Sequence, residues 1–105
     1  MEAGRLRHRV KLQRYDRVSD GMGGYEEQWV DVATVWASVE PLQGRERFEA
    51  QQVQATTSHR VRMRYRSDVK PEMRVLFGSR ILHIQAVIDP QERHRELQLL
   101  CEEEQ

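Results

Sequence analysis

The sequence predicts a mainly β fold, a small antiparallel barrel or sandwich of about six strands with one short helix in an insertion loop. One observation is the strict alternation in segment 59–66, which places four arginines on one face and Val61, Met63 and Tyr65 on the other. A helix would spread these arginines around its circumference, whereas a strand aligns them. Another observation is the series of short apolar segments separated by turn-forming residues, which is typical of strands joined by hairpins.

Length and composition limit the size of the core and the class of partner. The chain of 105 residues is long enough for one domain, assigned here to residues 1–105. Only 38% of the residues are hydrophobic and the mean hydropathy is -0.81, so the core is expected to be thin. The 17 basic and 17 acidic residues balance, which argues against a general nucleic-acid binder with a strongly basic field and leaves room for a local basic patch.

Cysteine content and hydropathy indicate the cellular environment. Cys101 is the single cysteine, so we expect neither an intrachain disulfide nor a zinc site built from several thiolates. Spanning a bilayer takes about 20 consecutive apolar residues, and the sequence has no such run. The N-terminal residues lack the apolar region of a signal peptide. We therefore expect a soluble chain made in a cytoplasm, with no membrane partner.

The first predicted strand covers residues 5–13, where basic side chains alternate with Leu6, His8, Val10 and Leu12. Residues 16–24 contain three glycines and several other turn formers, which predicts a mobile hairpin loop.

The next two predicted elements are a long strand and the helix. Residues 25–40 are rich in Val and Trp, and a change of apolar parity near Ala33 predicts a bulge before Pro41 ends the strand. Residues 44–55 contain good helix formers. Phe48 is the only large apolar residue on the weak stripe of this helix, so the helix needs a neighbour to stabilise it.

The second half of the chain predicts four more strands and an acidic tail. A turn at residues 67–71, a tight reversal at 78–79 and a loop that begins at 89–90 separate them. The four predicted strands are residues 56–66, 73–77, 80–88 and 96–102, and the acidic tail is residues 102–105.

No arrangement of side chains predicts catalysis. His8 and His83 lie within predicted strands, where a hydrogen-bonded and partly buried imidazole is the usual state, while His59 and His94 are expected to be exposed. No histidine pair has metal-ligand spacing. Ser58 precedes His59, but neighbours on a strand point to opposite faces, so no triad is expected. We therefore predict no catalytic residue, no metal site and no cofactor.

The arginine faces have two interpretations. In one, each face is solvated and its arginines pair with Glu26, Glu40 or Glu96 on adjacent strands. In the other, a face meets an acidic partner subunit or DNA phosphates, for which guanidinium groups are well suited. The sequence leaves both interpretations open.

The order of short motifs along nearly the whole chain resembles the head-closure, or head–tail joining, proteins of long-tailed bacteriophages. The motifs follow a basic first strand and are Asp-Gly-Met-Gly-Gly at 20–24, Trp-Ala-Ser-Val-Glu-Pro at 36–41, Gly-Arg-Glu at 44–46, Arg-Tyr-Arg at 64–66, Ile-Gln-Ala-Val-Ile-Asp at 84–89 and Leu-Gln-Leu-Leu-Cys-Glu at 97–102.

This resemblance implies a structural protein of the virion neck with a small β-barrel and a long insertion at residues 41–57. The chain would form a homo-oligomeric ring beneath the portal and its adaptor, retain packaged double-stranded DNA and provide the docking surface for the tail-completion or tail-tube protein. The insertion residues expected to face the channel are Gln43, Arg45, Glu46, Arg47, Gln51 and Gln52. The residues expected at subunit or adaptor contacts are Arg5, Arg7, Arg9, Arg60, Arg62, Arg64, Arg66 and Phe48.

Two other classes of function are a nucleic-acid-binding module and an enzyme. A small nucleic-acid-binding barrel would stack bases on Trp29, Trp36 and Tyr65. Zero net charge and the inward direction predicted for Tyr65 count against it. An enzyme would need a metal or a cluster of groups with shifted pKa values, which the sequence does not show.

Overall fold

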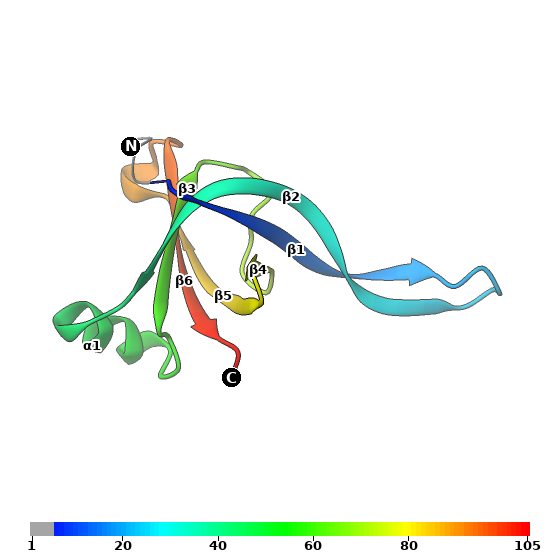
Figure 1. The fold of residues 1–105 in the computed structure, drawn as a ribbon, viewed down its shortest axis with the longest axis horizontal. Coiled ribbons are helices and arrows are strands. Elements are labelled where there is room, and N and C mark those ends of the chain that lie inside the picture. Colours follow the sequence, from blue (N-terminus) through cyan, green and yellow to red (C-terminus); the bar gives the residue numbers. More distant parts are fainter. Residues whose placement is uncertain (1–5) are drawn as a thin grey trace.

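The structure is a computed structural model that describes residues 6–105, in which six antiparallel strands form a closed barrel in the order β1-β2-β3-β6-β5-β4 (Figure 1). The predicted mainly β fold is confirmed, and the architecture is a barrel. The elements are β1 (His8–Ser19), β2 (Tyr25–Pro41), α1 (Gly44–Val53), β3 (His59–Arg64), β4 (Arg74–Phe77), β5 (Arg80–Ile88), the 3₁₀ turn η2 (Pro90–Glu92) and β6 (Glu96–Glu103).

The barrel interior is filled by the apolar faces of the alternating strands. Val61 and Met63 of β3 face Leu99 and Leu97 of β6 in the ladder, and all four side chains are buried. Tyr65 packs at the edge of this core. The alternation of segment 59–66 therefore has the predicted consequence, because period-two side chains on a half-buried strand must divide between core and exterior.

The first hairpin is longer than predicted. Residues 16–19 were expected in a loop, but they extend β1 and pair with residues 25–28 of β2, leaving only residues 20–24 as the connection. Figure 1 shows that this distal part of the hairpin projects away from the barrel, which gives the molecule an extent of 51 Å against 29 and 27 Å. Residues 16–19 form a strand in spite of their turn propensity because residues 25–28 pair with them. Residues 16–28 are called the arm below.

The long strand β2 has the predicted irregularity. Its register against β1 shifts between Leu12 and Gln13, where Ala33 and Asp31 are the successive partners and Val32 is the extra residue. The bulge thus lies next to the predicted position. Bulges bend a strand and increase its twist, and this one lies where the barrel part of the hairpin passes into the arm.

The helix α1 occupies the insertion between β2 and β3, as predicted. It has no buried residue, and Figure 1 shows it at the opposite end of the long axis from the arm. Leu42, immediately before the helix, is buried, and its backbone N–H donates to the carbonyl of Ser58. The barrel therefore holds the base of the insertion and leaves the helix outside its core.

Candidate functional site

Polar contacts attach the helix α1 to the barrel. The carboxylate of Glu46 lies 2.7 Å from the guanidinium of Arg60 on β3. The side-chain amide of Gln51 donates to the carbonyl of Thr57 at 3.2 Å. Thr57 is buried, so the end of the insertion is fixed while the helix itself contributes no side chain to the core.

The other channel-facing candidates lie on the surface of the insertion. Gln43 precedes the helix and makes no side-chain cap. Arg45 pairs with Glu49 one turn later at 3.1 Å, a contact between two exposed side chains that contributes little to stability. Arg47 and Gln52 are exposed. Phe48 is 65% exposed, an unusual state for a large aromatic side chain on a helix beside its own barrel.

The arginine face of β3 is partly a structural network. Arg60 retains 12% of its side-chain exposure and lies between Glu46 of α1 and Glu40 of β2. Arg62 approaches the same Glu40 carboxylate at 4.0 Å. The predicted cross-strand pairing with Glu40 is therefore confirmed. Neither Glu26 nor Glu96 forms an ion pair within residues 6–105.

The remaining arginines differ in their surroundings. Arg66 makes a two-bond contact with Asp68, and this hydrogen bonding holds the pKa of Asp68 below its usual value. Arg64 is exposed and forms no ion pair in the described part of the chain. The guanidinium of Arg9 lies 5.3 Å from the ring centroid of Trp36.

The first-strand candidates are only partly described. Arg7 is exposed before the start of β1, and Arg5 lies outside the described residues.

A polar cluster at one end of β3 corrects two predictions. His59 was expected to be exposed, yet its side chain retains 14% exposure, and burial is the main cause that lowers its pKa. Ser58 was expected to point away from it, yet Ser58 Oγ lies 2.8 Å from His59 Nδ1. Ser58 precedes the strand, so the alternation rule does not apply to this pair.

The hydrogen bonds of this cluster hold strands together. His59 Nε2 lies 3.2 Å from a guanidinium nitrogen of Arg80, which binds Glu103 through two hydrogen bonds. A neutral imidazole that donates from Nδ1 to Ser58 and accepts from Arg80 satisfies both ring nitrogens. Burial lowers the pKa of His59, and the guanidinium of Arg80 adds to this effect while the carboxylate of Glu103 opposes it, so the protonated form that a general base would acquire is disfavoured. The cluster joins β3, β5 and β6.

The other histidines follow their predictions in two of three cases. His83 is half-buried and lies 3.0 Å from a carboxylate oxygen of Glu104, as a partly buried strand histidine should. His94 is exposed, as predicted. His8 was predicted to be partly buried, but it is exposed and its ring lies 4.7 Å from that of Phe77. The alternation near residue 8 therefore marks an exposed strand end that lies beside an edge aromatic residue.

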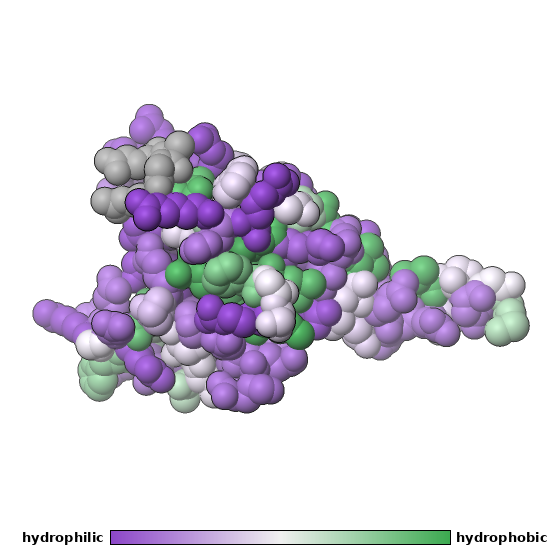
Figure 2. All heavy atoms as spheres, in the orientation of Figure 1, coloured by the Kyte–Doolittle hydropathy of each residue, from purple (hydrophilic) through white to green (hydrophobic). Residues whose placement is uncertain are grey.

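The arm ends in a loop organised by one carboxylate. Asp20 Oδ1 accepts hydrogen bonds from the backbone N–H groups of Met22 and Gly24, at 2.7 and 3.1 Å. Gly21 and Gly23 adopt positive φ, which glycine allows without steric cost. The predicted glycine turn is therefore present. Met22 is 87% exposed, and Figure 2 shows hydrophobic surface at this end of the arm.

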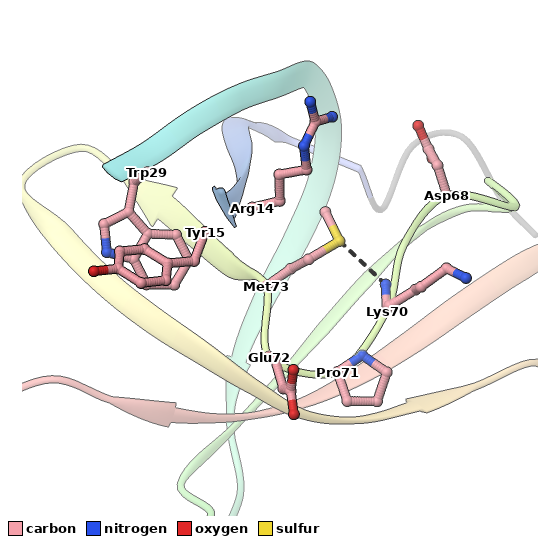
Figure 3. Close-up of a pocket in the computed structure, with 8 residues that line it drawn as sticks. All are labelled: Arg14, Tyr15, Trp29, Asp68, Lys70, Pro71, Glu72 and Met73. Carbon is pink, nitrogen blue, oxygen red and sulfur yellow. Dashed lines mark hydrogen bonds between the residues drawn. The ribbon is translucent and has the colours of Figure 1, made fainter. Parts of the chain in front are cut away.

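A pocket of about 660 Å³ lies at the root of the arm. Figure 3 shows the rings of Tyr15 and Trp29 against each other on one side of it, with Met73 between them and Lys70. The guanidinium of Arg74 lies 4.2 Å from the Trp29 ring centroid. These contacts pack the arm root against the segment 70–74 of the barrel.

Of the three aromatic residues proposed for base stacking, Trp29 lies apart from the other two. Trp29 lies at the arm root and one of its faces is occupied by Arg74, whereas Trp36 and Tyr65 line a separate pocket. The ring of Tyr65 contacts that of His94 at 4.6 Å. A continuous stacking surface for single-stranded nucleic acid needs adjacent, open aromatic faces, and this arrangement lacks them.

Within residues 6–105 there is no group of three or more His, Cys, Asp or Glu residues that could hold a metal ion. No helix in the same range is both long and apolar enough to cross a membrane. Cys101 is fully buried, and burial raises its pKa to about 12.

The profile of the phage head completion protein family matches residues 1–104. The chain belongs to this family. It is therefore a structural component of the bacteriophage virion, and the family resemblance identified from the motifs is confirmed.

Individual head completion proteins support the same assignment. Head completion protein gp16 of Bacillus phage SPP1 is 32% identical over 73 residues, which cover 70% of this chain and 67% of that protein. Head completion protein gp7 of Enterobacteria phage HK97 is 35% identical over 75 residues, covering 71% and 67%.

Solved structures share the barrel of this head completion protein. Protein SF1141 of Shigella flexneri 2a superimposes with a TM-score of 0.78 at 30% identity, covering 98% of this chain and 96% of that one. A chain from the virion of a native gene transfer agent particle gives a TM-score of 0.62 at 25% identity, covering 95% and 96%.

Proposed function

We propose that this head completion protein forms a ring beneath the portal and its adaptor, where it retains packaged DNA and offers a docking surface to the tail. The observation that carries the proposal is the helix α1, which has no buried residue and is attached to its own barrel by polar contacts. Exposed Phe48 and Val53 on such a helix need a covering surface, and neighbouring subunits around a channel supply one.

The charge of the insertion fits a surface that meets DNA without binding it tightly. Residues 43–53 contain two arginines and two glutamates, and the other polar side chains are glutamines. Because tight DNA binding depends on several unpaired cations that release counterions, a neutral surface predicts weak affinity with little salt dependence. A closure that must later open for genome release needs this property.

DNA retention by filled, tailless heads assembled without this protein tests the proposal. Purified chain is added, and DNA leakage and tail attachment are followed. We expect both retention and tail joining to be restored. Continued leakage with no binding to the heads would overturn the proposal.

The insertion is tested separately with the triple substitution Arg47→Ala, Phe48→Ala and Gln52→Ala. All three side chains are exposed, so barrel stability should change by less than about 0.5 kcal/mol. The variant should bind heads but leak DNA, while Lys70→Ala, on the arm-root pocket, serves as a matched surface control and should retain it. Full retention by the triple variant would remove the insertion from the closure.

A further inference from the structure

A row of side chains crosses the outer face of the barrel and is centred on Trp36. Arg9 of β1 and Trp36 of β2 are register partners. On the other side of β2, Ala37 pairs with Met63 of β3. Trp36 and Arg64 are therefore the next residues opposite each other on these antiparallel strands, and both line a pocket of about 320 Å³. Trp36 is 52% exposed. These residues, Arg9, Trp36 and Arg64, are called the Trp36 patch.

The Trp36 patch is both apolar and cationic. Arg64 forms no ion pair within residues 6–105, although Glu96 is its register partner on β6. Arg9 contacts the indole face. Tryptophan and arginine are among the residues that contribute most to protein interfaces. The positive charge of the two arginines favours an acidic partner.

The arm carries the complementary chemistry. Residues 16–28 include four carboxylates and one arginine, Arg17, whose guanidinium lies 4.9 Å from the ring centroid of Tyr25. Glu26 and Glu27 form no ion pair in the described part of the chain. Met22 and Tyr25 are exposed apolar side chains on the same tip. The tip therefore offers apolar area within a negative field, and Asp20 orders its loop before any contact is made.

The two surfaces cannot meet within one molecule. Glu26 and Trp36 lie on the same strand, ten positions apart, which corresponds to about 30 Å at roughly 3.3 Å per residue. The hydrogen-bonded ladder with β1 keeps this part of β2 extended. Any contact between arm tip and Trp36 patch must therefore join two copies.

We propose that the arm tip of one copy docks on the Trp36 patch of the next. Such a contact is heterologous, because the two surfaces differ, and its repetition produces a closed ring when the rotation between copies closes. The inference rests on the proposed ring and assigns its subunit contact: Glu26 and Glu27 meet Arg9 and Arg64, and Met22 or Tyr25 covers Trp36. It selects Arg9 and Arg64 from the larger set of arginine candidates.

Site-specific disulfide formation in concentrated solution tests the contact. The variants Glu26→Cys and Arg64→Cys are mixed, oxidised and separated without reductant, and buried Cys101 leaves the background low. The mixture should yield dimers, and the double variant should yield a ladder of larger covalent species. Monomers throughout, or an equal yield of dimers from Glu26→Cys alone, would overturn the proposal.

Charge reversal supplies an independent readout. The cross-linking mixture for this test contains Glu26→Cys as the arm partner and Arg9→Cys as the patch partner. Adding Arg64→Glu to the patch partner should lower the dimer yield by about tenfold or more, because it places a negative charge opposite Glu27. Adding Glu27→Arg to the arm partner should restore most of the yield, while Lys70→Glu, away from the patch, should leave it unchanged. An unaffected yield with Arg64→Glu would overturn the electrostatic pairing. DNA retention by the wild-type chain is measured alongside, so failure of the contact and failure of the neck function are distinguished.

Discussion

The two projections of the barrel differ in how they are held. The arm continues the β1–β2 ladder beyond the bulge at Val32, so paired backbone extends from the core to residues 19 and 25. The insertion connects the paired strands β2 and β3, and its helix α1 is attached through side-chain contacts such as Glu46 with Arg60. A ladder transmits rigidity along its length, whereas a few polar contacts allow a segment to open while the barrel stays folded.

This difference matches the roles proposed for the two ends. A subunit contact that must position copies in a ring benefits from a preformed, rigid element. A closure that must retain DNA and later release it needs a segment with a low cost of rearrangement. The arm would therefore provide the rigid element and the insertion the segment that rearranges easily, from opposite ends of one barrel.

Removing a core side chain should destabilise the arm and the insertion together, because both projections depend on the same barrel. Leu99 is completely buried on β6, so Leu99→Ala should lower the free energy of unfolding by about 2–5 kcal/mol. Urea denaturation followed by circular dichroism measures this effect. Val53→Ala, on the exposed side of α1, should change stability by less than about 0.5 kcal/mol. Similar values for the two variants would show that the assigned core is incorrect.

Loosening the arm tip should leave the barrel unaffected. Asp20→Ala removes the two hydrogen bonds that order the loop, at a local cost of about 1 kcal/mol. Backbone order parameters at Met22 and Gly24 should fall from about 0.85 to below about 0.6, while the melting temperature is retained. Asp20→Asn keeps an accepting oxygen and should preserve most of the order. An unchanged loop in Asp20→Ala would mean that the glycines alone define it.

Loosening the helix should have a still smaller energetic effect. Glu46→Gln weakens the contact with Arg60, and a pair with one exposed partner is worth roughly 0.2–1 kcal/mol. Hydrogen exchange should accelerate in α1 and remain unchanged in β3. Glu49→Gln, which affects only the exposed Arg45 pair, is the matched control and should accelerate exchange less. Equal acceleration in both variants would exclude Glu46 as the main attachment.

Acidification should weaken the barrel near the base of the insertion. Burial lowers the folded pKa of His59 below its ordinary 6.5, so the unfolded chain binds a proton first as pH falls. The contribution of neutral His59 is complete above about pH 6.5 and is lost between that value and the lower folded pKa. Unfolding experiments at pH 7 and 5.5 measure the loss, which His59→Gln should reduce. The same pH slope in both proteins would assign the effect to other groups.

The sequence by itself determined the strands and the insertion. Alternation in residues 59–66 and 96–102 and the turn formers between segments are local properties, and they predicted β3, β6 and their buried faces. Strand β5 occupies the predicted residues 80–88. Period-two patterning succeeds here because one face of each strand must enter the core.

Only the tertiary structure decided the length of the arm and the state of the arginines. Residues 16–19 became a strand because residues 25–28 pair with them, which no local propensity encodes. Arg60 and Arg64 are equivalent in the sequence pattern, yet the first is enclosed by Glu40 and Glu46, whereas the second lies beside Trp36 and has no ion pair within residues 6–105. The partner of a side chain comes from a distant part of the chain, so its charge is compensated or available according to the packing of neighbouring strands.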